Sequence, residues 1–343
     1  MATFIIAEAG VNHNGDHTRA LELVDVAASA GADAVKFQTF SADKLTRRGA
    51  AKAEYQQRAT GAGDQYEMLK ALEMSEELHD KLVARCAALG IEFMSTAFDE
   101  QSLDMLVSLG IKRIKVPSGE LTNFPFLRYM AERDLPLIVS TGMASLVEVQ
   151  DAVAVIDEQR RASGLQRPMS EMVTILHCTS NYPARAQDVN LRAMATLGQE
   201  TNLPVGYSDH TLGIAISTAA VALGATVIEK HFTINKSLPG PDHAASLEPD
   251  ELTALVSAIR AVEVAMGDGV KAPTADELPV RALVRRSVTL VRDVAKGQAV
   301  TAEMVQLMRP GNGIEPKHLR DVFGRLAARD LSSGQTLDWS DLQ

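Results

Sequence analysis

The stretch Val227-Ile228-Glu229-Lys230-His231 is a short apolar run that ends in side chains capable of chemistry. Seven further runs of this kind lie at residues 4–8, 34–38, 93–96, 114–118, 137–141, 175–178 and 205–210. Helical patterns separate most of them, as expected for buried parallel strands joined by crossover helices. Eight such units in about 250 residues predict an α/β fold of the (β/α)8 or TIM-barrel type, whose strand ends meet at one mouth. We therefore expect an enzyme.

The composition argues against several other classes of protein. The 343 residues carry a formal net charge of −10, and no basic run, such as Arg47-Arg48 or Arg285-Arg286, is longer than two residues. Binding to a phosphate backbone needs a clustered basic surface, so no nucleic-acid partner is expected. No stretch approaches the roughly 20 apolar residues that span a bilayer, and the first residues lack a charged region and a cleavage pattern, so we expect no secretory signal. Two cysteines offer no disulfide framework, and we expect a cytoplasmic enzyme without a membrane partner.

Breaks in the pattern predict three segments. Residues 1–267 form the barrel, and its last amphipathic helix begins near Asp250 and ends at Gly267. Residues 268–284 contain scattered glycine and proline and are typical of a linker. In residues 285–343, the stretches 292–300 and 329–337 resemble each other, each with a Gly-Gln turn between two short apolar segments. This repeat predicts a small, mostly β module with pseudo-twofold symmetry.

Two helices carry recognisable capping signals. Ser145 followed by Glu148 is a capping-box pattern, which predicts that a helix begins after the fifth strand. Ser75 should begin another helix, which Gly90 should end.

The connection at residues 41–74 is unusually long for a single crossover helix. Long connections in compact domains tend to be lids or binding loops. We expect a lid over the substrate, and a surface insertion without a role is the alternative.

Side chains alternate across a strand, so that residues i and i+2 share a face. Lys36 therefore shares a face with Gln38, and Glu229 shares a face with His231. Phe37 should point the other way, toward the helices. These two polar pairs are expected to point into the barrel.

The ends of the seventh and eighth strands should bring two imidazoles and two carboxylates together. They belong to His210, His231, Asp209 and Glu229, while Lys230 should face away from the barrel interior. Two neutral imidazoles with oxygen ligands suit a divalent metal such as Mn²⁺, Fe²⁺ or Zn²⁺. With open coordination positions the metal would be a Lewis acid for a substrate oxygen. The alternative is a pair of structural histidines held by hydrogen bonds.

Two lysines and several hydroxyls at neighbouring strand ends indicate a pocket for a phosphate or carboxylate. These residues are Lys36, Lys115, Ser118, Ser140 and Thr141. Two other interpretations remain open. One buried lysine could be the nucleophile of Schiff-base chemistry, or the lysines could neutralise barrel carboxylates such as Glu8 and Glu120.

Several motifs, taken in order, resemble those of the sialic acid synthases. They are AEAGVNHNG at 7–15, VKFQT at 35–39, PSGE at 117–120, STGM at 140–143, SDHT at 208–211, EKHFT at 229–233, GPDH at 240–243 and RPGNG at 309–313. The C-terminal module is similar to the antifreeze-like domain of that family, also called the SAF domain. The resemblance runs from the first strand to the end of the chain.

This resemblance implies a metal-dependent condensation of phosphoenolpyruvate with an N-acyl mannosamine-type sugar, with release of phosphate. The metal, usually Mn²⁺, would be held by His210 and His231 and would polarise the open-chain aldehyde. C3 of phosphoenolpyruvate would attack that aldehyde while water adds at C2.

The resemblance also implies roles for individual residues. Glu120 and Glu229 would handle protons or orient sugar and water, and Gln38 and Tyr182 would contact the sugar. Phosphoenolpyruvate would be held by Lys36, Lys115, Ser118, Ser140 and Ser208.

A swapped homodimer is part of what the resemblance implies. Arg309 would reach the acylamino group of the partner's substrate, and Asp242 would act near that interface. Certain sialic acid synthases have an acidic residue in place of Asn14, beside the sugar site, and others have Asn in place of Ser180. Asn14 occurs both in N-acetylneuraminate synthases and in the legionaminate branch, which takes a 2,4-diacetamido-6-deoxy sugar, so the acceptor stays open.

Three other functions compete with this interpretation. A deoxy-heptulosonate or octulosonate phosphate synthase would need a second phosphate site, and no second cluster of lysine and arginine occurs at strand ends. A Schiff-base aldolase predicts borohydride trapping of substrate on Lys36 or Lys115 and insensitivity to chelators. A non-enzymatic carbohydrate- or ice-binding protein predicts sugar binding without metal or phosphoenolpyruvate.

Overall fold

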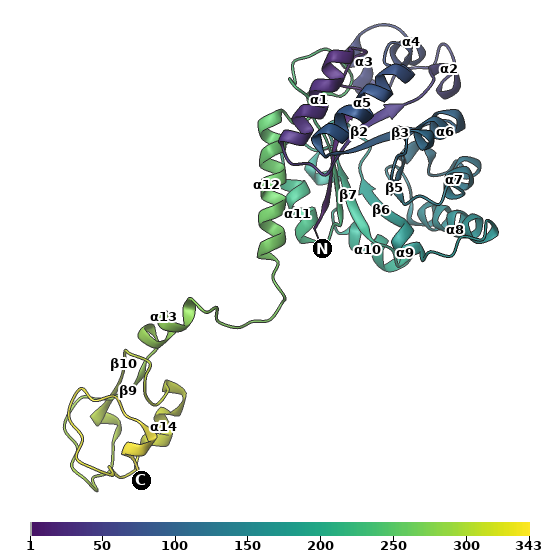
Figure 1. Ribbon diagram of the computed structural model, residues 1–343. Helices are drawn as coiled ribbons and strands as arrows, with labels where there is room; N and C mark the ends of the chain where they lie inside the picture. Colours follow the sequence, from purple (N-terminus) through teal and green to yellow (C-terminus); the bar gives the residue numbers. More distant parts are fainter. Residues whose placement is uncertain (1) are drawn as a thin grey trace. The chain divides into compact units, whose positions relative to one another are not determined.

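Eight parallel strands close into a barrel in the order β1 to β8 (Figure 1), in a computed structural model that describes residues 2–343. β1 pairs with β8 to close it, and the predicted (β/α)8 barrel is confirmed. The strands are β1 (Phe4–Gly10), β2 (Ala34–Thr39), β3 (Glu92–Ala97), β4 (Ile114–Val116), β5 (Leu137–Ser140), β6 (Val173–Cys178), β7 (Val205–Asp209) and β8 (Val227–His231).

β4 is shorter than the sequence pattern predicted. It ends at Val116, before Pro117, and Ser118–Glu120 form a 3-10 turn. Proline has no backbone N–H to donate to the ladder, so the strand stops there. The residues after Pro117 therefore leave the alternation of the strand.

The helices around the barrel begin and end where capping chemistry favours it. The predicted capping box is present, with the Glu148 N–H donating to Ser145 Oγ and the Ser145 N–H donating to Glu148 Oε2. Ser75 caps the helix that ends at Gly90, whose φ of 71° is left-handed. The helices are α1 (His17–Ser29), α5 (Glu76–Leu89), α6 (Glu100–Ser108), α7 (Phe124–Ala131), α8 (Leu146–Ala162), α9 (Met169–Met172), α10 (Ala193–Thr201), α11 (Ala215–Ala222) and α12 (Pro249–Ala265).

The hydrophobic core lies on both sides of the barrel wall. Phe37 and Ile228 pack among the helices, as the alternation predicted. Each large side chain buried in this way stabilises the fold by roughly 1.5–3 kcal/mol. A smaller cluster with inward side chains fills the base of the barrel: Ile6, Ala34, Met94, Ile138, Leu176 and Val227.

The long connection between β2 and α5 folds into three short helices. They are α2 (Ala42–Leu45), α3 (Glu54–Thr60) and α4 (Gln65–Lys70). A separate hydrophobic cluster holds this connection against the ends of β1 and β3; it contains Val11, Phe40, Met68 and Leu72, with Leu45, Leu69 and Phe98 against them.

A second compact unit spans Asp268–Gln343 and has its own hydrophobic core. It contains α13 (Glu277–Val284), which lies within the predicted linker, the antiparallel pair β9 (Ser287–Leu290) and β10 (Val305–Met308), and α14 (Leu319–Val322). The Gly311 N–H donates to Ala282 O at 2.8 Å, so α13 is tied to the module.

The internal repeat of this unit pairs with itself. Val294 and Leu331 exchange two backbone hydrogen bonds of 2.9 Å. Asp330 accepts from the Lys296 N–H and Asp293 accepts from the Ser333 N–H, both at 2.7 Å. These reciprocal contacts agree with the predicted pseudo-twofold symmetry.

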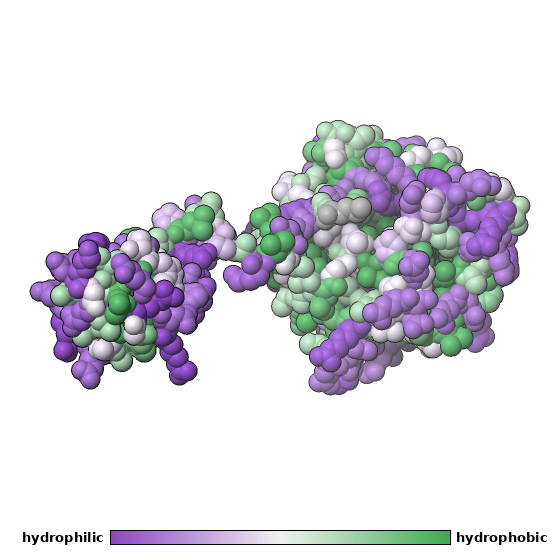
Figure 2. Space-filling model, turned by 90° about the horizontal axis from the view of Figure 1, so that it is seen from below, coloured by the Kyte–Doolittle hydropathy of each residue, from purple (hydrophilic) through white to green (hydrophobic). Residues whose placement is uncertain are grey.

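The surface mixes polar and apolar residues. Hydrophilic side chains cover most of the second unit on the face that Figure 2 shows. On the same face of the barrel unit, hydrophobic patches lie between hydrophilic ones. Within residues 2–343, no helix has the length and hydropathy to cross a membrane.

Candidate active site

A cavity of about 480 Å³ is lined by residues at the carboxyl ends of the barrel strands. Because parallel strands present these ends at one rim, residues far apart in sequence meet there. The predicted site residues that line it are Lys36, Gln38, Lys115, Ser118, Ser140, Tyr182, Ser208, His210, Glu229, His231 and Asp242.

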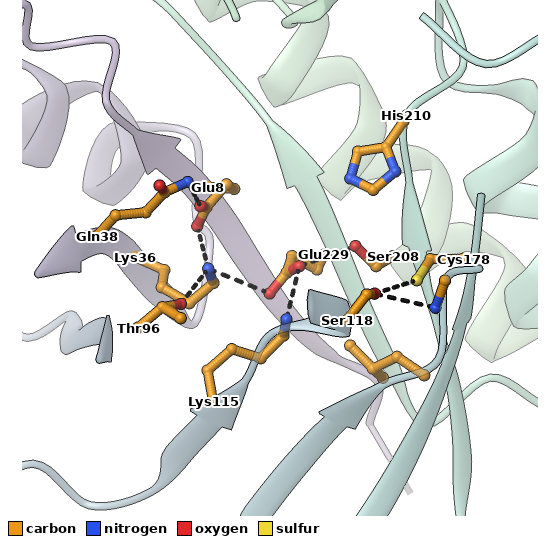
Figure 3. Close-up of polar contacts among 12 residues, drawn as sticks. Glu8, Lys36, Gln38, Thr96, Lys115, Ser118, Cys178, Ser208, His210 and Glu229 are labelled. Atoms are coloured by element: carbon orange, nitrogen blue, oxygen red, sulfur yellow. Dashed lines mark hydrogen bonds and ion pairs between the residues drawn. The ribbon is translucent and has the colours of Figure 1, made fainter. Parts of the chain in front are cut away.

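Two buried lysines and two buried carboxylates form the floor of the cavity (Figure 3). Lys36 Nζ lies 2.6 Å from Glu8 Oε2 and 3.6 Å from Glu229 Oε2, and it donates to Thr96 Oγ1 at 3.0 Å. Lys115 Nζ lies 3.4 Å from Glu229 Oε1. The interpretation that the lysines neutralise barrel carboxylates is therefore right for Glu8.

The four charges set one another's protonation. Burial raises the pKa of Glu229, but Lys115 and Lys36 outweigh it and bring that pKa to about 2. Burial raises the pKa of Glu8 to about 7 against the opposing effect of Lys36. Burial lowers the pKa of Lys36, yet Glu229 and Glu8 together leave it above its usual value. For Lys115, burial outweighs Glu229 and the pKa is lowered.

Hydroxyl groups line the cavity beside the lysines. Ser208 Oγ donates to Glu229 Oε1 at 2.8 Å. Ser118 Oγ accepts from the Gly142 N–H at 2.9 Å and lies 3.3 Å from Cys178 Sγ. Ser140 Oγ is buried and has no hydrogen-bond partner within residues 2–343, so this hydroxyl is available to a ligand.

Gly142 is required for this arrangement. A Cβ at this position would overlap the hydroxyls of Ser180 and Ser118. The glycine thus lets the backbone N–H approach Ser118.

The imidazoles of His210 and His231 lie side by side, with ring centroids 5.6 Å apart. His210 Nδ1 lies 2.8 Å from Thr179 O; a carbonyl only accepts, so Nδ1 carries the proton and Nε2 keeps its lone pair. His231 Nδ1 is buried and has no partner among the described residues. Burial lowers the pKa of His210 to about 4 and that of His231 well below its usual value. Both imidazoles are therefore neutral near pH 7, the state in which histidine binds metals.

Asp209 does not join this group, and the prediction that both carboxylates meet the imidazoles is wrong for it. Its Oδ2 lies 2.9 Å from Lys230 Nζ and accepts from Ser217 Oγ at 2.6 Å. The side chain of Asp209 points outward because it alternates with that of Ser208. The prediction that Lys230 faces away from the interior is confirmed. Within residues 2–343, no three His, Cys, Asp or Glu side chains are grouped to hold a metal.

An aromatic stack covers the imidazoles. The Tyr182 ring lies 4.2 Å from the His210 ring and meets the His231 ring edge-on at 5.6 Å, centroid to centroid. Tyr55 of α3 stacks on Tyr182 at 5.1 Å. Asp242 also lines the cavity, and burial raises the pKa of its carboxyl to about 6.

Three predicted site residues lie elsewhere. The Glu120 carboxylate accepts from Asn123 Nδ2 at 2.7 Å and does not line the cavity. Asn14 donates to Pro239 O, likewise outside the cavity lining. Arg309 belongs to the second unit, Asp268–Gln343, and is not part of the barrel unit.

Sequence reasoning assigned no role to several residues that line the cavity. Glu8 was recognised only as a carboxylate, although its place two residues after the inward-facing Ile6 was a usable signal. Tyr55, Thr96 and Cys178 also line it. No sequence signal marks Tyr55, because its position depends on how the long connection folds.

Comparisons with known proteins give a consistent result. Residues 23–271 match the NeuB family, and residues 285–343 match the SAF domain. The chain is 56% identical over 344 residues to the N,N'-diacetyllegionaminic acid synthase of Legionella pneumophila, covering 100% of this chain and 95% of that protein. It is 44% identical to the Campylobacter jejuni protein of the same name, covering 98% of each.

A solved structure has the same fold. The N-acetylneuraminic acid synthetase of Leptospira borgpetersenii, in complex with citrate, is 34% identical and superposes with a TM-score of 0.71. The match covers 82% of this chain and 90% of that one.

Proposed function

The chain belongs to the NeuB family and ends in a SAF domain, and from this premise we propose that it condenses phosphoenolpyruvate with an N-acyl amino sugar. The products are a nonulosonic acid and phosphate, and the enzyme is a transferase that forms a C–C bond. One observation carries the proposal: two lysines and a row of hydroxyls lie in one cavity with two neutral imidazoles. The first group suits an anion and the second suits a metal ion.

The acceptor that we propose is 2,4-diacetamido-2,4,6-trideoxymannose, which would give N,N'-diacetyllegionaminic acid. The relatives at 56% and 44% identity both carry the name of that synthase. Of the two acceptors that the sequence left open, these relatives favour the diacetamido sugar over N-acetylmannosamine.

Phosphoenolpyruvate is proposed to bind at the floor of the cavity. Charge-assisted hydrogen bonds from Lys36 and Lys115 would hold its carboxylate and phosphate. The hydroxyl of Ser140, which is buried without a partner, supports a ligand at this place, and Ser118 and Ser208 would complete the set.

A divalent metal ion, Mn²⁺, is proposed to bind His210 and His231. The neutral imidazoles and the unpartnered Nδ1 of His231 fit such an ion. When bound, the ion would supply Lewis-acid polarisation of the acceptor's carbonyl oxygen. These two imidazoles would be the protein's metal ligands, and water and substrate oxygens would fill the remaining positions.

The reaction balances with these groups alone. C3 of phosphoenolpyruvate attacks the acceptor's aldehyde carbon, the oxygen of water adds at C2, and the bond from C2 to the phosphate oxygen breaks to leave a carbonyl at C2. Of the two protons of the water, one ends on the former aldehyde oxygen and the other on the released phosphate. Glu229, which lines the cavity and is kept ionised by two lysines, is in position to accept a hydrogen bond from the water and so orient it. Glu120 does not line the cavity, so we do not extend this role to it.

The acceptor is proposed to lie against Tyr182, Gln38 and Asp242, above the phosphoenolpyruvate. Arg309 of a partner subunit would approach its acylamino group in a swapped homodimer, as the resemblance implies. We place the reaction in the cytoplasm, where phosphoenolpyruvate is available.

An isotope experiment tests the reaction. Phosphoenolpyruvate labelled with ¹⁸O at the bridging oxygen is incubated with enzyme, Mn²⁺ and the diacetamido sugar, and both products are analysed by mass spectrometry. Cleavage at C2 places the label in phosphate. Label retained in the sugar acid, or phosphate released equally without acceptor, would contradict the proposal.

A further inference from the structure

One side of the cavity is apolar, and we call it the apolar wall. It comprises Val11, Met68, Leu69, Leu72 and Phe98, all of which line the cavity and belong to the hydrophobic cluster under the long connection. Val11, Met68 and Leu72 are at most 9% exposed. The wall is therefore a packed surface and not a set of mobile side chains.

The apolar wall lies nearer the mouth than the charged floor. Thr96 is opposite Lys115 in the strand register, and Phe98 comes two residues later, directly after β3 ends at Ala97. Because the chain leaves β3 on the side where the carboxyl ends of the strands meet, Phe98 lies nearer the mouth than Lys115. Val11 likewise comes three residues after Glu8, which is opposite Lys36.

The side-chain amide of Gln65, beside the apolar wall, has an N–H group that donates to no described residue. Gln65 lines the cavity and its Oε1 accepts from Thr46 Oγ1 at 3.1 Å. An amide N–H next to apolar side chains is complementary to an acetamido group, which presents a carbonyl oxygen and a methyl.

We propose that the apolar wall and Gln65 select the acceptor by its far end, carbons C4 to C6. This inference rests on the proposed function. If C1 of the open-chain sugar meets phosphoenolpyruvate at the floor, C4 to C6 extend toward the mouth, where the apolar wall lies. The wall takes the C6 methyl and the methyl of the 4-acetamido group, and Gln65 donates to the acetamido carbonyl.

The same surface disfavours N-acetylmannosamine. That sugar carries hydroxyls at C4 and C6, and a hydroxyl against Leu69 or Phe98 would lose its hydrogen bonds to water without gaining a partner. Apolar pockets of this kind discriminate by roughly 10- to 200-fold. The preference is thus built into residues 65–72 of the connection together with Val11 and Phe98, and not into the charged floor.

The test is the ratio of kcat/KM for the diacetamido sugar to kcat/KM for N-acetylmannosamine. Leu69→Asn adds a hydrogen-bonding group to the apolar wall, and we expect this ratio to fall about tenfold. The KM for phosphoenolpyruvate should stay within about twofold, because the floor is unchanged. Leu223→Asn is the matched control, since Leu223 is 58% exposed at the end of α11, and its ratio should equal that of the unmodified enzyme.

Gln65→Leu provides an independent variant if Leu69→Asn does not fold. It removes the donor at a half-buried position, and the ratio should again fall. Unchanged ratios in the folded variants, or equal use of both sugars by the unmodified enzyme, would overturn this inference and leave the reaction class intact. Turnover of neither sugar would overturn the proposed function, and the inference with it.

Discussion

Lys115 and Lys36 share the carboxylate of Glu229, and this sharing sets the charge of the cavity floor. Glu229 is only 5% exposed, so its charge depends on these partners. An anionic ligand at the floor would form ion pairs with the same two ammonium groups, those of Lys36 and Lys115.

Lys115→Met is expected to weaken phosphoenolpyruvate binding. The variant loses a charged donor worth about 1.5–3 kcal/mol, so the KM for phosphoenolpyruvate should rise roughly 10- to 100-fold. The control is Lys112→Met, at an exposed lysine three residues earlier. Steady-state kinetics at saturating acceptor measure the effect, and an unchanged KM would contradict the assignment of Lys115 to the anion site.

Asp242→Asn should change how stability depends on pH. Burial raises the pKa of this carboxyl from 3.8 to about 6, so the folded protein binds the proton more tightly than the unfolded chain. The stabilisation is fully present below pH 3.8 and is lost as the pH rises through about 6. The variant does not titrate, so its free energy of unfolding relative to the unmodified protein should rise by roughly 2 kcal/mol between pH 4 and pH 7.

Urea unfolding at several pH values measures this difference. Asp151→Asn, on the exposed side of α8, should run parallel to the unmodified protein. A constant difference between the Asp242→Asn variant and the unmodified protein would mean that the carboxyl does not titrate in this range.

At this scale the sequence predicted the cavity residues where strand alternation holds. Lys36, Glu229 and His231 follow the alternation, and their side chains point into the barrel as predicted. Glu120 does not, because Pro117 ends β4 and the 3-10 turn that follows has a different side-chain period. Asp209 does follow the alternation. It points outward to Lys230, so the prediction that it meets the imidazoles is wrong.

Among the elements, β7 and β8 are joined by a buried ion pair behind the two histidines. Asp209 and Lys230 are each 1% exposed or less, and their oxygen and nitrogen are 2.9 Å apart. Each residue directly precedes a histidine of the candidate metal site. The pair should therefore hold the two strand ends, and with them the imidazoles, at a fixed separation.

Lys230→Met is expected to cost about 3–5 kcal/mol in the free energy of unfolding, because it leaves a buried carboxylate unpaired. It should also weaken Mn²⁺ binding measured by calorimetry, although Lys230 faces away from the cavity. Lys81→Met, which removes an exposed ion pair with Glu77, should cost less than about 1 kcal/mol. Unchanged metal affinity in a folded Lys230→Met protein would show that the pair is only structural.

The long connection shows the limit of prediction for elements. Its length and composition exclude one crossover helix, and the three observed helices agree with that. Helices of four to seven residues do not form by propensity alone. α2 and α4 pack in the cluster that contains Val11 and Phe98, and α3 stacks Tyr55 on Tyr182, contacts that no local pattern reveals. That the connection opens and closes as a lid stays a prediction.

For the whole molecule, the two units have separate hydrophobic cores. The cluster of the second unit contains only residues beyond 287, and the main barrel clusters contain none of them. A chain that ends at residue 284 should therefore fold, with a cooperative thermal transition of the barrel. We expect it to bind phosphoenolpyruvate normally and to lose most of its turnover, because it lacks Arg309.

Arg309→Ala in the full chain is the companion variant. It should raise the KM for the sugar and leave the KM for phosphoenolpyruvate unchanged. Full activity of the shortened chain would show that the SAF domain is not needed for turnover. An equal rise in KM for both substrates in the Arg309→Ala variant would contradict a role of Arg309 in binding the sugar.

The most direct test of the central claim is phosphate release from phosphoenolpyruvate, measured with Mn²⁺ and the diacetamido sugar in the presence and absence of EDTA. We expect release that requires the sugar, stops with EDTA and returns when Mn²⁺ is added in excess. Release that persists with EDTA, or no release with either sugar, would contradict a metal-dependent condensation at this cavity.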